Sequence, residues 1–208
     1  PNSQGFTQKA AKMNLNLPTE LSGRVAYSFD VKVENPINGG PTTLPWCILL
    51  GANGDNTLAA GYIYVYPNNQ ISYSNGKDQV VAISLGKNVG WIRVQGMMNY
   101  DTKTYTLQIV DSEGNKLFPG PDAPNLDILN FYDSSFTHFE KLTIINGWNQ
   151  ANVNYRQLSL DNINIAEYVP VQSVSISDIS LQMDTVTKSV YTLSASVVPS
   201  NATYTGIK

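Results

Sequence analysis

The sequence predicts an all-β protein, and three observations support this fold class. Residues 25–33 alternate between apolar and polar side chains, which is the period of two expected for a half-buried strand. Many further short apolar segments are separated by loops rich in Gly, Asn, Asp and Pro. No convincing amphipathic helix is present, and residues 8–13 are the one short candidate. Short strands with turns between them are typical of a sandwich or barrel.

The first strand places one set of residues toward a core and a second set toward solvent. The apolar set is Val25, Tyr27, Phe29, Val31 and Val33. A loop rich in Asn, Gly and Pro ends this strand. Further strands are expected near residues 46–51, 60–66, 70–74, 80–85, 91–98, 104–110, 115–118, 127–132, 139–146 and 157–166. Residues 99–103 and 111–115 have the composition of hairpin loops.

The last of these strands changes phase. Leu158 and Leu160 share one face, whereas Ile163 and Ile165 have the opposite parity. If both pairs belong to the core, a β-bulge at Asp161-Asn162 must reset the alternation. The alternative is that one pair faces solvent.

Four segments, taken in order, resemble one family. They are Ser22–Val31, Gly90–Val94, Asp101–Leu107 and Leu160–Ile165. Residues 1–168 thereby resemble a concanavalin A-like lectin/glucanase sandwich, the jelly roll of laminin-G-like modules. The resemblance implies a two-sheet antiparallel β-sandwich (jelly roll) in which a first strand lies beside the last. It also implies a concave face or loop edge that often binds sugars.

The first β-rich unit ends at Tyr168–Gln172, and a second segment with its own apolar pattern follows. The following residues, through the run Val198-Pro199-Ser200-Asn201-Ala202-Thr203, resemble the opening strands of a bacterial Ig-like domain of group 2. This implies a partial Ig-like β-sandwich over residues 169–208, within a longer parent chain. Such modules occur along secreted and surface proteins, so an extracellular, cell-surface or periplasmic bacterial location is expected. The apolar face of this half-sandwich would consist of Val174, Ile176, Leu181, Leu193, Ala195 and Val197.

Composition and charge argue against several classes of function. With a net charge of −3 and scattered Lys and Arg, the sequence does not provide the clustered positive charge that nucleic-acid binding requires. The longest apolar runs are too short for membrane insertion. A single histidine, His138, and a single cysteine, Cys47, cannot by themselves form a zinc site. A structural or surface role is expected for His138, and a small buried hydrophobe for Cys47.

Catalytic motifs are weak. Asp30 and Glu34 share a strand face, but their spacing differs from the paired carboxylates of the glucanase branch, and a solvated face is favoured. A lyase that uses Arg93 or Arg156 with a tyrosine stays open. No cofactor is expected, except a structural calcium at Asn53 and Asp55 in an oxygen-rich loop. An ordinary turn is the alternative there, and Asp161-Asn162 is a weaker calcium candidate.

Aromatic residues carry the positive argument for function, because sugar rings stack on Trp and Tyr while polar side chains orient them. Trp148 lies in a polar loop with Asn149 and Gln150, and is either an exposed platform or a plug of that loop. Tyr155 and Arg156 follow closely. Of the other tryptophans, Trp91 is expected in the core, whereas Trp46, which follows Pro45, is ambiguous and is included among the ligand-binding candidates.

A second aromatic group consists of Tyr62, Tyr64 and Tyr66 on one face of a strand. If residues 67–70 close a simple hairpin, Tyr64 lies opposite Tyr73, and the residues between the tyrosines point into the core. The result would be a tyrosine-lined outer or concave face. The alternative is that the tyrosines themselves fill the core.

These observations predict a non-catalytic carbohydrate-binding module of a secreted or surface bacterial polysaccharide-processing protein. Its partner would be a polysaccharide or oligosaccharide, beside further domains of the same parent chain. One alternative is a catalytic polysaccharide lyase or glycosidase on the same fold. A second alternative is an adhesion or spacer module without a glycan site.

Overall fold

The structure is a computed structural model, and it describes residues 12–34, 45–52, 58–84, 90–119, 128–146, 157–176, 195–198 and 200. All regular secondary structure in these residues is β. The strands are β1 (Lys12–Ser22), β2 (Arg24–Glu34), β3 (Trp46–Ala52), β4 (Gly61–Val65), β5 (Gln70–Asn75), β6 (Asp78–Ser84), β7 (Ile92–Asn99), β8 (Thr104–Thr106), β9 (Gln108–Asp111), β10 (Lys116–Phe118), β11 (Ile128–Asn130), β12 (His138–Asn146), β13 (Gln157–Glu167), β14 (Ser173–Ile176) and β15 (Ala195–Val198).

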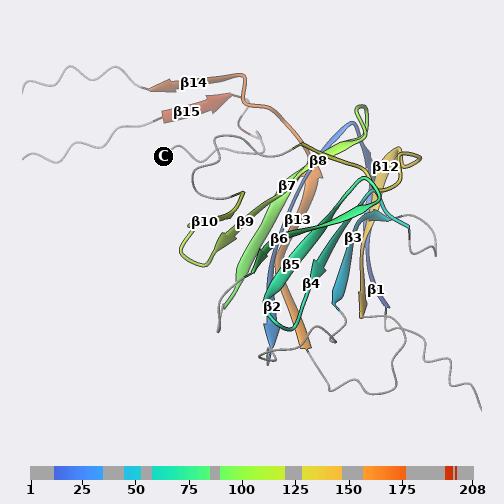
Figure 1. Cartoon of the computed structure of the whole chain (residues 1–208). Coiled ribbons are helices and arrows are strands. Elements are labelled where there is room, and N and C mark those ends of the chain that lie inside the picture. The colour runs from blue at the N-terminus through green and yellow to red at the C-terminus, as the bar shows by residue number, and fades with distance from the viewer. Residues whose placement is uncertain are drawn as a thin grey trace, which may run out of the picture. The chain divides into compact units, whose positions relative to one another are not determined.

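Two antiparallel sheets pack face to face as a sandwich, which confirms the predicted fold class (Figure 1). The six-stranded sheet has the order β1-β12-β3-β4-β5-β6. The seven-stranded sheet has the order β10-β9-β7-β2-β13, with β8 paired to β7 and to β11. The first predicted strand, β2, therefore lies beside the last strand of the sandwich, β13, as the resemblance implied.

The core lies between the two sheets. The apolar face of β2 lies in it, because Val25, Tyr27, Phe29 and Val31 are each at most 1% exposed. Ile48, Leu50 and Ile63 of the six-stranded sheet belong to the same cluster of buried side chains. The alternation read from residues 25–33 is thus confirmed for these positions, and it leaves Asp30 on the opposite, solvent-facing side of the sheet.

The hairpin between β4 and β5 has a different register from the one predicted. Asn69 adopts a positive φ of 61°, and the Tyr66 N–H donates to the Gln70 carbonyl. A three-residue loop with its last residue in the left-handed conformation therefore joins the strands. Tyr73 pairs with Ile63, not with Tyr64, and packs in the inter-sheet core at 6% exposure. The expected pairing of Tyr64 with Tyr73 was wrong for this reason.

The short helix candidate was also wrong where the structure describes it, because Lys12 and Met13 belong to strand β1. This edge strand pairs with β12, and its register shifts between Asn16 and Leu21. Pro18 lies inside this irregularity, where the missing N–H breaks no ladder hydrogen bond. The alternation Met13-Asn14-Leu15-Asn16-Leu17 is a signal for this strand, and Pro18 interrupts it.

The phase change in β13 is confirmed. Asn162 has a positive φ of 49° within the strand. Leu160 before it and Ile165 after it differ in parity, yet both pack against the core. The local change of backbone conformation resets the alternation, as a bulge does. Ile163, by contrast, is 36% exposed, so it contributes less to the core than expected.

The chain divides into two units, residues 1–166 and residues 167–208. The predicted boundary, after residue 168, lies just beyond this point. In the second unit β14 and β15 pair antiparallel, with Val174 opposite Val197 and Ile176 opposite Ala195. Leu181 and Leu193 lie outside the described residues, and the Ig-like assignment stays a prediction.

Candidate functional site

A cleft of about 490 Å³ lies on the solvent-facing side of the seven-stranded sheet. Strands β2, β7, β9 and β13 contribute to it, together with the turn that follows β9. Its lining combines one aromatic ring, one guanidinium and several carboxylates. The lining residues are Asp30, Trp91, Ile92, Arg93, Val110, Asp111, Ser112, Glu113, Gly114, Asp161 and Asn162.

The pleat of β7 directs two of these residues into the cleft. Ile92 and Val94 are 3% and 0% exposed and face the core. Arg93 therefore points to the opposite side, and Trp91, which precedes the strand, shares the parity of Arg93. Trp91 is half-buried and lines the cleft. The expectation that Trp91 lies in the core was wrong, because its neighbour Ile92 takes the core position.

Asp30 and Arg93 form a bidentate ion pair across the β2–β7 ladder. The two residues are direct partners in the register. Arg93 donates from Nε to Asp30 Oδ1 at 2.7 Å and from Nη2 to Asp30 Oδ2 at 3.1 Å. The hydrogen bonds from Arg93 lower the pKa of Asp30, and the same contact raises the pKa of Arg93. Both groups stay charged at neutral pH, and the plane of the guanidinium is fixed.

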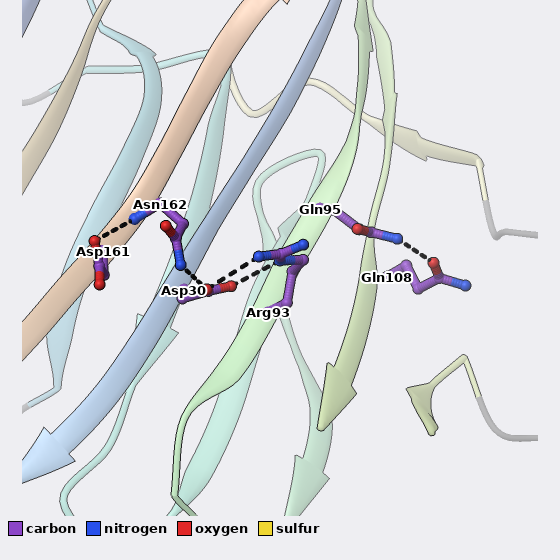
Figure 2. A network of polar contacts seen from close by, with 6 residues as sticks. All are labelled: Asp30, Arg93, Gln95, Gln108, Asp161 and Asn162. Carbon is purple, nitrogen blue, oxygen red and sulfur yellow. Dashed lines mark hydrogen bonds and ion pairs between the residues drawn. The ribbon is translucent and has the colours of Figure 1, made fainter. Parts of the chain in front are cut away.

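Asn162 holds the other side of the Asp30 carboxylate. Its side-chain Nδ2 donates to Asp30 Oδ2 at 2.6 Å, and its backbone N–H donates to Asp161 Oδ1 at 2.7 Å (Figure 2). The left-handed conformation of Asn162 occurs at this point of β13. The phase change in β13 thus places an amide beside the ion pair, and Asp161 at the edge of the cleft.

The turn after β9 forms one wall of the cleft. The Asp111 carboxylate accepts hydrogen bonds from the N–H groups of Glu113 and Asn115, and from Asn115 Nδ2. These hydrogen bonds, the one from the Asn115 side chain first, lower the pKa of Asp111. Gly114 adopts a positive φ of 87°, which closes the turn. Glu113 is left exposed on this wall.

A second polar row continues across the same sheet face. Gln95 lies two residues after Arg93 on the same face of β7, and its Nε2 donates to Gln108 Oε1 at 2.6 Å (Figure 2). Ser28 of β2 lies opposite Gln95. The outer face of the sheet therefore carries further hydrogen-bonding side chains beyond the ion pair.

The expected tyrosine face exists in part, on the six-stranded sheet. Ile63 and Val65 point into the core, as predicted. Tyr62 and Tyr64 stack with ring centroids 6.1 Å apart, and Tyr132 meets Tyr62 edge-on at 4.6 Å. Tyr62 itself is only 7% exposed, and burial raises its pKa. Ring area is therefore presented by the half-buried Tyr64, Tyr66 and Tyr132.

Two further aromatic candidates on this sheet, Tyr66 and Trp46, contact neighbouring side chains. The Tyr66 hydroxyl accepts a hydrogen bond from Gln79 Nε2 at 2.6 Å. Trp46 is half-buried and packs against the core, and Cys47 beside it has a pKa raised to about 12 by burial. These contacts give Trp46 a packing role. Whether Tyr62, Tyr64, Tyr66 or Trp46 binds a ligand stays a prediction.

The other predicted site residues cannot be placed. Trp148, Asn149, Gln150, Tyr155 and Arg156 lie outside the described residues, as do the calcium candidates Asn53 and Asp55. Among the residues that the structure describes, no three His, Cys, Asp or Glu side chains are grouped so as to hold a metal. None of the described segments is a helix that could cross a membrane. His138 begins β12, with Nε2 3.6 Å from Glu20 Oε1.

Comparisons with known proteins bear on the fold. No protein-family model matches the sequence, and no curated protein matches it. Among solved structures, a sialidase aligns at 13% identity with a TM-score of 0.52, covering 76% of this chain and 14% of the sialidase. A Trypanosoma rangeli sialidase aligns at 12% identity and a TM-score of 0.40, covering 69% and 20%. A Ruminococcus gnavus IT-sialidase CBM40 bound to α2,3 sialyllactose aligns at 10% identity and a TM-score of 0.28, covering 68% and 94%.

The likeness to the first sialidase shows the fold alone, because the sequence identity is low. It agrees with a two-sheet antiparallel β-sandwich, and the aligned part of this chain spans about one seventh of that sialidase's length. The finer concanavalin A-like and Ig-like assignments stay predictions.

Sequence reasoning missed the cleft although one signal for it was present. The alternation Trp91-Ile92-Arg93-Val94 places the indole and the guanidinium on one face of a strand whose other face is aliphatic. Asp30 was correctly assigned to an outer face, but interpreted only as solvated. Asp30, Arg93 and Asn162 come together because β2 lies between β7 and β13 in the sheet. The sequence alone does not reveal this strand order.

Proposed function

We propose that this chain is a carbohydrate-binding module and that the cleft above β2, β7, β9 and β13 is its glycan site. One observation carries the proposal. Trp91 and Arg93 project from the same face of β7 into a cleft whose polar groups are already fixed by the Asp30 and Asn162 contacts. Its volume, about 490 Å³, lies in the range typical of small-ligand sites.

The lining suits the chemistry of a sugar. An indole offers a flat surface against which the C–H face of a pyranose ring packs. The N–H groups of Arg93 that the ion pair does not use can donate to ring or hydroxyl oxygens. Carboxylates of Asp111, Glu113 and Asp161 can accept from sugar hydroxyls. Because the guanidinium is already oriented, less side-chain entropy is lost when a ligand binds.

Two carboxylates of the cleft, Asp30 and Asp111, are unsuited to the role of a catalytic acid. A glycosidase needs an acid whose pKa is raised, so that it holds a proton at neutral pH. The contacts of Asp30 and Asp111 lower the pKa of both groups, so both are ionised. Asp30 is also committed to Arg93 and Asn162. We therefore propose a non-catalytic module, located outside the cell or on a bacterial surface and attached to further domains.

The test is a glycan array followed by calorimetry on the hits, with two matched variants. Trp91→Ala should weaken binding by about two- to twelvefold or more, given about 0.5–1.5 kcal/mol for an aromatic contact beyond area burial. Tyr66→Ala, on the six-stranded sheet, should leave affinity unchanged. Loss of affinity in Tyr66→Ala but not in Trp91→Ala would transfer the site to the tyrosine group. New reducing ends released from a bound glycan would contradict the non-catalytic assignment.

A further inference from the structure

We infer that the cleft selects glycans without acidic groups, with amino sugars bound more tightly than neutral sugars and sialic or uronic acids rejected. The inference rests on the proposed function, since it assigns the chemical class of ligand to the same site. It follows from the excess of carboxylates in the lining of the cleft and from the ion pair that Arg93 already forms with Asp30.

The carboxylates of the cleft outnumber its cations. Among the described lining residues, Arg93 is the one cation, against Asp30, Asp111, Glu113 and Asp161. The bidentate contact with Asp30 neutralises Arg93 locally. Three carboxylates are then left without a cation among the lining residues, so the lining itself carries an excess of negative groups.

Arg93 is poorly placed to receive an acidic sugar. Asp30 occupies the side-on fork of Arg93, in which Nε and Nη2 both donate. A ligand carboxylate would have to use the remaining end-on N–H groups of a guanidinium whose charge Asp30 already balances. Displacing Asp30 would leave its negative charge in the cleft beside the incoming one. Asn162, which donates to Asp30 at 2.6 Å, further stabilises the existing arrangement.

The same groups favour hydroxyls and ammonium groups. Ionised carboxylates are acceptors only, so each sugar hydroxyl can donate to them. The protonated form of an amine at a ring carbon gains in addition a favourable charge interaction with Glu113 or Asp161. Both side chains are exposed on the walls of the cleft, so the preference will be weakened by salt.

The test uses a printed array of neutral, sialylated, uronic-acid and amino-sugar oligosaccharides, including chitosan oligomers. The best neutral binder is then oxidised at its C6 hydroxyl to the uronate and measured again by calorimetry. We expect the uronate to bind about tenfold more weakly or worse, because like charges are brought together. The double variant Glu113→Gln, Asp161→Asn should shrink this ratio, and Asp78→Asn, an exposed carboxylate of the other sheet, should leave it unchanged.

Each outcome decides between the claims. Sialylated or uronic glycans as the strongest binders would overturn the selectivity and leave the glycan site standing. A uronate penalty that persists in the double variant and in high salt would show a steric cause, which also overturns the charge argument. An array with no binders of any class would overturn the proposed function itself.

Discussion

Arg93 and Asp30 lie opposite each other on β7 and β2, and two hydrogen bonds of 2.7 and 3.1 Å join the guanidinium to the carboxylate. The pair is asymmetric in exposure, with the Arg93 side chain 44% exposed and the Asp30 side chain 15% exposed. Such a pair contributes little to stability, because solvent screens it. The ion pair holds the guanidinium in one orientation in the cleft.

The first prediction follows from this pair. Asp30→Asn should lower the free energy of unfolding by less than about 1 kcal/mol, because the ion pair is exposed to solvent. Affinity for a neutral glycan should fall clearly, because Arg93 loses the partner that orients it. Urea denaturation and calorimetry measure the two effects. A variant that loses much stability but keeps full affinity would mean that the pair is structural.

The second prediction concerns pH. The folded-state pKa of Asp30 lies below its ordinary value of 3.8, so its charge contributes stability above that value and the contribution is lost as pH falls further. Glycan affinity should therefore be flat from pH 7 to about pH 4 and decline below. A calorimetric titration series in buffers of equal ionic strength tests this. Affinity that already falls between pH 7 and pH 5 would implicate a group with a higher pKa.

The third prediction separates two roles of Asn162. Its φ of 49° suits glycine, whereas alanine is strained there by roughly 1 kcal/mol. Asn162→Ala should thus be less stable than Asn162→Gly. Both variants lack the amide that donates to Asp30, so both should lose glycan affinity to a similar degree. Thermal unfolding with matched binding data checks both statements, and equal stability of the two variants would contradict the backbone argument.

The fourth prediction concerns Gly96 of β7, where the strand lies very close to the backbone of Thr106 in β8. A Cβ on Gly96 would overlap the Thr106 carbonyl oxygen, which also accepts a hydrogen bond from the Tyr27 hydroxyl at 2.8 Å. Gly96→Ala should cost about 1–3 kcal/mol of stability or more, since backbone must move to relieve the overlap. Gly90→Ala, where a Cβ meets open space, is the control. Equal unfolding midpoints for the two variants would contradict the prediction. They would show that the backbone near Gly96 and Thr106 moves apart at no cost in stability.

Several elements of the fold could be predicted because their signal is local. The alternation in β2 and the loops after β7 and β9 depend on neighbouring residues in the sequence. The phase change at Asn162 was predictable for the same reason, since it follows from the parities of Leu160 and Ile165.

Register and convergence could not be predicted in the same way. The sequence Pro67-Asn68-Asn69-Gln70 fits a four-residue loop as well as a three-residue one, and the choice decides on which face Tyr73 lies. Asn162 meets Asp30 across 132 residues of chain. That contact exists only because β13 and β2 are neighbours in the sheet.

The central claim is that a glycan stacks on Trp91 in the cleft, and the three tryptophans of the chain allow a direct test. Each gives one indole N–H signal in a ¹⁵N-correlated NMR spectrum, assigned by substituting Trp46, Trp91 and Trp148 in turn. During titration with the best array hit, we expect a saturable shift of the Trp91 signal and a stationary Trp46 signal. A shift of Trp148 together with Trp91 would extend the site to the predicted loop. A shift of Trp148 with Trp91 unmoved would show that the glycan does not bind at Trp91.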